Sequence, residues 1–185
     1  HLHSMREQWK GNRTQRINLL RAVLHEHGIE APTKIDAFLK VAHALVDDEL
    51  LQAIAPQLHL ILADITHFQL SMDECEKQLA RLLKKDVVAE RLDEVSGIGI
   101  LTASAFMTTV VQPERFRNGR MLSAWLGMTP RENSSGNKRK LGSISRQGNT
   151  YLRMLLIHGA RSALLAAKRR ATTAPDKLTA LQRWA

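Results

Sequence analysis

Two adjacent serines in the segment 127–149 are the residues of this sequence best placed to do chemistry. Ser134 and Ser135 stand directly before Gly136. The segment also carries five cations: Arg131, Lys138, Arg139, Lys140 and Arg146. A serine hydroxyl that attacks a phosphodiester needs positive charge beside the non-bridging oxygens and a backbone that lets the phosphate approach. The segment therefore fits a nucleophile for phosphoryl chemistry, although its spacing alone favours a flexible loop that only holds phosphates.

A second candidate site is the turn that contains Gly97 and Gly99. Apolar residues flank this Gly-x-Gly step, and a predicted helix follows it directly. The pattern is typical of a helix-hairpin-helix, in which glycines let the backbone pass close to a phosphate and the amides of the next helix bind its oxygens. Such a hairpin contacts the nucleic-acid backbone, not the bases. The same step also occurs where two helices simply pack tightly.

Other kinds of site are not supported by the residue pattern. His25 and His27 are two residues apart on a predicted helix and point in different directions, and His158 stands alone. No cluster of His, Cys, Asp or Glu has the spacing of metal ligands, so we expect no metal site in this chain. With a single tyrosine in the chain, we also expect no aromatic platform for stacked bases.

The excess positive charge is confined to residues 115–170. These 56 residues contain thirteen Lys and Arg against Glu132 alone, a balance of +12. The rest of the chain has fourteen basic and seventeen acidic residues, a balance of −3, which gives the net charge of +9. Basic residues concentrated in one stretch are typical of a nucleic-acid-binding region. Arg153 lies in this stretch, and we predict that it binds phosphate together with the loop cations.

The bulk composition indicates a folded protein without a membrane span or a disulfide. The chain has 185 residues, of which 44% are hydrophobic and 24% charged. No apolar run approaches the roughly 18 residues that a transmembrane helix needs, and the chain does not open with a secretion signal. Its one cysteine fits a reducing compartment. We therefore expect a cytoplasmic protein with no membrane partner.

Helical spacing recurs along the chain and strand signals are nearly absent, so we expect an all-α fold. The first helix is predicted over residues 4–27, and Gly28 ends it. Thr33 is the predicted N-cap of a second helix. The final long helix is predicted to begin at Asn149 and to run through Arg170.

The third predicted helix carries the most regular pattern in the chain. Its apolar residues alternate steps of three and four: Leu58, Ile61, Ile65, Phe68, Met72, Cys75, Leu79 and Leu82. A period of 3.5 residues keeps one seam against a partner helix in a left-handed supercoil. We expect a homo-oligomer formed through this 58–82 seam, while packing against another helix of the same chain stays an open alternative. Met72 and Cys75 lie in the seam and are predicted to be packing residues.

These patterns divide the chain into four parts. A helical linker segment is expected at residues 1–56, a coiled-coil helix at 57–86 and a compact helical domain at 87–170. Seven of the ten glycines fall between residues 97 and 148, which indicates tight turns between short elements. Residues 171–185 are predicted to be a linker and the start of a truncated helix. Because a helical stripe continues to the last residue, we expect a piece of a longer protein.

Several short motifs follow one another in a definite order between residues 92 and 165. They are Gly97-Ile98-Gly99, Arg115-Phe116, Trp125-Leu126-Gly127, Ser134-Ser135-Gly136, Ile144-Ser145-Arg146, Gly148-Asn149 and Tyr151-Leu152-Arg153. In order and spacing they resemble the C-terminal transposase domain of bacterial insertion-sequence transposases of the 110/1111 type, relatives of the Piv invertases. Residues 5–85 are similar to the helical linker and coiled coil of that family.

The resemblance implies a bacterial DNA recombinase that excises and inserts its own element. In many members a structured guide RNA directs the reaction, and the DNA partners are the element ends and the target. The family nucleophile is a serine in the Ser-Gly step of the basic loop, which becomes covalently joined to DNA. That position is Ser135 here, with the adjacent Ser134 less favoured. Tetramers with coiled-coil contacts are also a trait of the family.

One part of the family pattern has no counterpart in this sequence. Members carry an N-terminal RNase H-like domain whose four acidic residues hold Mg²⁺, and nothing in residues 1–30 resembles it. We therefore expect no cofactor in this chain itself, Mg²⁺ bound through the missing domain, and no recombination by the fragment alone. The alternatives are a non-catalytic helix-hairpin-helix module that binds nucleic acid and an adaptor that only oligomerises.

Overall fold

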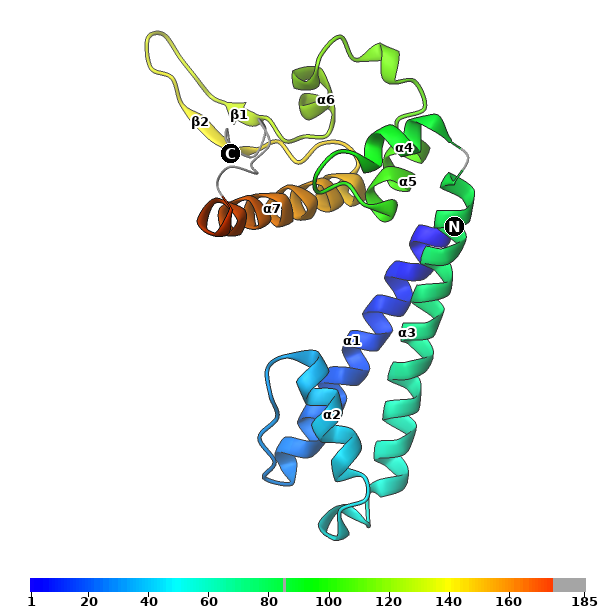
Figure 1. The fold of residues 1–185 in the computed structure, drawn as a ribbon. Helices are drawn as coiled ribbons and strands as arrows, with labels where there is room; N and C mark the ends of the chain where they lie inside the picture. Colours follow the sequence, from blue (N-terminus) through cyan, green and yellow to red (C-terminus); the bar gives the residue numbers. More distant parts are fainter. Residues whose placement is uncertain (85, 175–185) are drawn as a thin grey trace. The chain divides into compact units, whose positions relative to one another are not determined.

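The computed structural model describes residues 1–84 and 86–174 and is mostly helical (Figure 1). Seven α-helices, two short 3-10 helices and one two-stranded sheet make up this described part. The chain forms two compact units, His1–Gln78 and Leu79–Ala185. The boundary falls near the end of the third helix, inside the segment predicted as a coiled coil.

The first unit contains α1 (Leu2–Glu26), α2 (Ile35–Leu45), η1 (Glu49–Leu51) and most of α3 (Ala55–Leu83). The predicted stop of α1 at Gly28 is confirmed. Gly28 has a φ of +75°, its N–H donates to the carbonyl of His25, and the N–H of Ile29 donates to the carbonyl of Leu24. This is a Schellman motif, in which a glycine in the left-handed region satisfies the last carbonyls of a helix.

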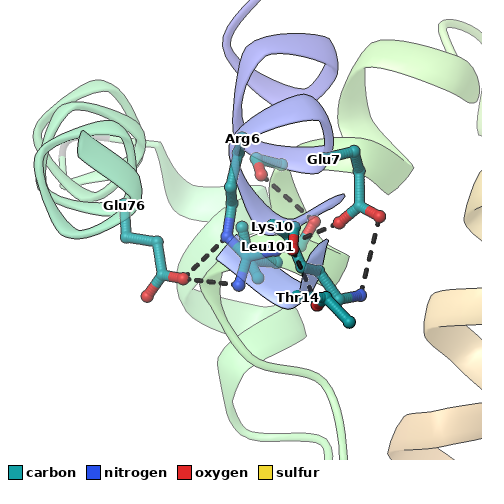
Figure 2. Close-up of polar contacts among 7 residues, drawn as sticks. Arg6, Glu7, Lys10, Thr14, Glu76 and Leu101 are labelled. Atoms are coloured by element: carbon teal, nitrogen blue, oxygen red, sulfur yellow. Dashed lines mark hydrogen bonds and ion pairs between the residues drawn. The ribbon is translucent and has the colours of Figure 1, made fainter. Parts of the chain in front are cut away.

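Helices α1 and α3 lie side by side and antiparallel, held by ion pairs along their length. Arg6 on α1 pairs with Glu76 on α3 at 2.7 Å (Figure 2). Further along, Arg16 pairs with Asp64 at 2.7 Å. Both pairs are partly exposed, so each stabilises the fold by at most about 1 kcal/mol. Their main effect is to fix the register in which the two helices meet.

The apolar seam of α3 lies largely inside its own chain. Leu58 and Ile65 of the seam are buried in one cluster with Leu20 and other residues of α1 and α2, and Ile61 packs against that cluster partly buried. Met72 and Cys75 are also buried, as predicted, and burial raises the pKa of the Cys75 thiol. Leu82, the last seam residue, is exposed. The first half of the seam therefore packs within one chain, the alternative left open above, and self-association remains a prediction.

The N-cap predicted for α2 is wrong by one residue. Lys34, in an extended conformation, occupies the cap position, and no side chain caps the helix. The backbone carbonyl of Thr33 instead accepts a hydrogen bond from the Arg21 guanidinium at 3.0 Å. The same guanidinium lies 4.3 Å from the ring centroid of the buried Phe38. A cation–π contact thus anchors the connection where a cap was expected.

The second unit contains the end of α3 and every later element. These are α4 (Val87–Asp93), α5 (Ile100–Thr109), η2 (Pro113–Arg115), α6 (Gly119–Trp125), β1 (Pro130–Glu132), β2 (Leu141–Ile144) and α7 (Thr150–Thr173). Its core joins α5, α6 and α7 through Ala105, Val110, Leu126 and Leu152. As predicted, Asn149 caps α7, since its side chain accepts from the Leu152 N–H at 2.8 Å.

Two features of this unit differ from the sequence-based expectation. The fold is mostly α-helical as predicted, but the segment expected to be a loop contains the antiparallel pair β1–β2. In addition, α7 continues past Arg170 to Thr173, so the predicted linker begins later. Ala171, Thr172 and Thr173 extend the helix because nothing in their sequence stops it before Pro175. The truncated helix predicted near the C-terminus lies outside the described residues.

No helix in residues 1–84 and 86–174 is long and apolar enough to cross a membrane.

The core of the first unit can be tested with two neighbouring leucines of α1. Leu20 is fully buried, whereas Leu19 is 43% exposed. We expect Leu20→Ala to lower the free energy of unfolding by about 2–5 kcal/mol, because it removes packing and leaves a cavity. Leu19→Ala should change it by only about 0.5 kcal/mol. Urea denaturation followed by far-UV circular dichroism measures both, and equal losses would contradict the observed orientation of α1.

Candidate nucleic-acid interface

The two predicted serines lie near the tip of the β1–β2 hairpin. Pro130 pairs with Ile144 and Glu132 with Leu141, and the register shifts by one residue between them. An isolated bridge joins Ser135 to Lys138 at the end of the ribbon. Gly136 has a φ of +57°, and Asn137 is not in the positive-φ region. Among two-residue hairpin turns, a positive φ at the first central residue alone is typical of type II′, which suits the twist of a hairpin.

The hydroxyl groups of the two serines have different surroundings. Ser134 Oγ donates to Glu132 Oε1 at 2.7 Å and accepts from the Lys140 N–H at 3.1 Å. Ser134 therefore fastens the two arms of the hairpin together. Among the hydrogen bonds of the described residues, none involves Ser135 Oγ, and the residue is exposed. The hydroxyl that the fold leaves available at the tip is thus that of Ser135.

The loop cations gather on this hairpin and face solvent. All residues from 131 to 140 are exposed. Lys138, Arg139 and Lys140 follow the turn, and Arg131 on β1 donates to the Ser145 carbonyl across the ribbon at 3.1 Å. Glu132 lies 3.8 Å from Arg139, but both side chains are more than half exposed. One exposed carboxylate offsets little of this charge, so the tip is strongly positive.

Glycines at the base of the hairpin let two backbone segments meet closely. Gly127 and Gly148 have φ values of +69° and +98°. A Cβ on Gly127 would overlap the Gln147 backbone, and one on Gly148 would overlap the Trp125 carbonyl oxygen. Arg146, exposed between them, has a φ of +58°. Such a conformation is uncommon for a residue with a side chain, and the Arg146 N–H bond to the Gly127 carbonyl at 3.0 Å holds it.

Arg153 does not join the exposed cations, contrary to the sequence-based prediction. It lies in the first turn of α7, and only 7% of the residue is exposed. Its guanidinium donates to the Leu126 carbonyl at 2.9 Å, to the Gln147 carbonyl at 3.4 Å and to Thr150 Oγ1 at 3.3 Å. A buried guanidinium that already binds backbone carbonyls positions the base of the hairpin and is not free to bind phosphate.

The Gly97–Gly99 step, predicted to be a helix-hairpin-helix, lies in the turn between α4 and α5 and not on the β-hairpin. Gly97 has a φ of +92°, and a Cβ there would overlap the Gly159 carbonyl oxygen of α7. Gly97 is therefore required for close packing, which was the alternative interpretation of the motif. Gly99 is the N-cap of α5, no side chain caps that helix, and space around it is open. Of the two glycines, only Gly99 leaves room for a phosphate.

Residues 115–170 contain several further cations that the sequence patterns did not assign to a site. Arg115, Arg117 and Arg120 lie on and around η2 and α6, and all are exposed. Arg161, Lys168, Arg169 and Arg170 are exposed along α7. The excess of basic residues over 115–170 indicated that these cations contribute to a binding surface. A count of charges could not distinguish the exposed cations from the buried Arg153.

Within the described residues, no three His, Cys, Asp or Glu side chains come together as a possible metal site. The carboxylates nearest in sequence to Ser135 are few, since Glu132 is the single acidic residue between 115 and 170. These residues do not fit a Mg²⁺ site of their own.

Comparison with known proteins is consistent with this geometry. Residues 89–174 match the domain described as the transposase of the IS116/IS110/IS902 family. The chain is 33% identical over 167 residues to a probable family 20 transposase of Pseudomonas aeruginosa, covering 88% of this chain and 49% of that protein. It is 33% identical over 171 residues to the transposase for insertion sequence element IS1111A of Coxiella burnetii, covering 90% and 47%.

A third relative is the transposase for insertion sequence element IS1328 of Yersinia enterocolitica, 31% identical over 160 residues, with 86% of this chain and 48% of that protein covered. The chain thus spans about half the length of the relatives it matches.

The different roles of Gly97 and Gly99 can be tested by alanine substitution of each. Gly97→Ala should destabilise the second unit by at least about 1–3 kcal/mol, because it combines a disfavoured φ with overlap against α7. Gly99→Ala should leave the fold intact and serves as the matched control. Thermal unfolding measures the stability of both, and nuclear magnetic resonance spectra report whether α5 and α7 stay packed. Equal tolerance of the two substitutions would contradict the close approach to Gly159.

Proposed function

We propose that this chain acts in DNA transposition, because residues 89–174 match the transposase domain described for the IS116/IS110/IS902 family. In this proposal it is the DNA-binding and nucleophile-bearing part of a longer transposase that moves an insertion sequence. The observation that carries the proposal is the exposed Ser135 hydroxyl at the tip of a cation-rich hairpin, which takes part in none of the hydrogen bonds among residues 1–84 and 86–174.

The proposed reaction is a transesterification at Ser135. Its Oγ attacks the scissile phosphorus, an Oγ–P bond forms, and the bond from phosphorus to one sugar oxygen breaks. The Oγ proton is lost, and the departing sugar oxygen gains a proton. Lys138, Arg139 and Lys140 neutralise the charge that develops on the non-bridging oxygens. Arg131 and Arg146 add positive charge at the hairpin base, and Gly99 with the amides of α5 holds DNA backbone at a separate point.

Three further features of the active protein belong to this proposal. Mg²⁺, which activates a nucleophile or polarises a phosphate when bound, is proposed to be held by an N-terminal RNase H-like domain of the longer protein. A structured guide RNA is a proposed partner in the bacterial cytoplasm. Self-association is proposed through α3, where Leu60 and Leu70 are 69% and 63% exposed. The fragment alone is then expected to bind DNA without recombining it.

The contribution of the hairpin to DNA binding is tested by its salt dependence. The affinity for duplex DNA should fall steeply with salt, with a log–log slope of about −0.9 for each phosphate contact. Replacing Lys138, Arg139 and Lys140 by Gln should make the slope shallower by up to about three such contacts. The matched control replaces the exposed Lys34, Lys40 and Lys77 of the first unit by Gln. Equal changes would show that net charge, not the hairpin, determines binding.

The nucleophile is tested in a longer protein in which the N-terminal half of a family transposase precedes this chain. With element ends, flanking RNA and Mg²⁺ present, a denaturation-resistant protein–DNA adduct should form, and mass spectrometry should map it to Ser135. Ser135→Ala should abolish the adduct while affinity for DNA is kept. Ser134→Ala, which weakens the hairpin but leaves Ser135, should reduce the adduct without abolishing it. DNA binding with no adduct would favour the non-catalytic binding module.

A further inference from the structure

A cavity of about 550 Å³ lies in the second unit, where the end of α5, η2 and the end of α6 meet. Its lining includes Val110, Gln112, Arg115, Phe116 and Trp125. A volume of this size is typical of small-molecule sites, which range over roughly 300–1,000 Å³. The cavity lies outside the hairpin, and the proposed reaction at Ser135 makes no use of it.

Two aromatic rings form one wall of this cavity. Phe116 and Trp125 meet edge to face, with ring centroids 5.5 Å apart and an interplanar angle of 60°. Phe116 is half-buried in the core cluster, whereas Trp125 is 41% exposed. The pair thus offers a fixed indole surface to an incoming planar group. Because Trp125 is partly exposed beside the cavity, part of its apolar indole surface is available to a binding partner.

The polar groups of the cavity and the positive charge around it indicate which chemical groups a ligand of this cavity would carry. Gln112 is exposed and carries both a donor and an acceptor, which can bind the edge of a base. Arg115 lines the cavity, and Arg117 and Arg120 follow it, against Glu114 alone. This local excess of positive charge suits a ligand that carries a phosphate. A planar group with hydrogen-bonding edges and an attached phosphate is a nucleotide.

We propose that this cavity receives one unpaired nucleobase of bound DNA. The base stacks on Trp125, its edge contacts Gln112, and the adjoining phosphate lies at Arg115. A paired base cannot enter, because its faces are covered by its neighbours and its edge by its partner. The proposal rests on the DNA-binding role proposed above, and it departs from the sequence-based expectation that the chain has no aromatic platform for a stacked base.

The cavity is joined directly to the base of the reactive hairpin. The Trp125 carbonyl is the group against which Gly148 packs, and Leu126, the next residue, gives its carbonyl to Arg153. Trp125 is therefore held by the same contacts that set the hairpin base. An extruded base bound there would fix the DNA strand relative to the element that carries Ser135.

The experiment uses the full chain and three DNA duplexes of one sequence. The first is fully paired, the second has one bulged 2-aminopurine, and the third has an abasic bulge. The bulged base should raise the affinity by about 5- to 150-fold over the abasic bulge, the range expected for stacking one base on an aromatic ring. The 2-aminopurine emission should fall on binding. The abasic duplex has the same flexibility but no base, so it is the matched control.

Two variants connect the effect to the cavity. Trp125→Ala should remove the difference between the bulged and abasic duplexes, and Trp125→Phe should retain most of it. Both should keep the salt dependence of binding to paired DNA. Equal binding of the bulged and abasic duplexes, with no change in emission, would overturn the proposal, because it would show that the cavity does not bind a base. A chain that binds none of the duplexes would contradict the DNA-binding role as well.

Discussion

The buried guanidinium of Arg153 is the interaction on which the candidate site depends. It donates to two backbone carbonyls, one on each side of the hairpin base, and to Thr150 at the start of α7. A hydrogen bond from a charged donor contributes about 1.5–3 kcal/mol, and removal of the donor would leave buried carbonyls without a partner. Because α7 is packed into the core through Leu152, the Arg153 side chain connects the short β-ribbon to a helix that the core holds.

The rest of the hairpin explains why such an anchor is needed. Its two strands contain three and four residues, and an isolated two-stranded ribbon is marginally stable in water. Residues 131–140 are all exposed, so no apolar face holds them. The stabilising contacts are local, namely the type II′ turn at Gly136 and the bonds of Ser134 Oγ to both arms. At the base of the hairpin, Gly127 lies close to the Gln147 backbone and Gly148 lies close to the Trp125 carbonyl. The exposed cations of the hairpin repel one another, and a bound polyanion would relieve that repulsion.

The sequence predicted the long helices α1, α3 and α7 well, since each has a recurring apolar spacing, and Gly28 and Asn149 mark the end of α1 and the start of α7. It did not predict the β1–β2 pair, because strands this short carry no alternation of apolar and polar residues. Nor could it assign Arg153, since burial of an arginine depends on which carbonyls the fold brings near it. The same reason applies to Gly97, which resembles a phosphate-binding glycine in sequence but is required by α7.

The motifs that carry the family resemblance serve two different purposes in this fold. Leu126, Leu152 and their neighbours make the core, and Gly127, Gly148 and Arg153 make the hairpin base. For these residues the fold itself is a sufficient reason for the residue type. Ser135 is different, because it packs against no core and its hydroxyl enters none of the hydrogen bonds among the described residues. Ser135 is therefore a motif residue whose identity is not explained by the contacts of the fold, and it lies in a hairpin where cations outnumber the single carboxylate of Glu132.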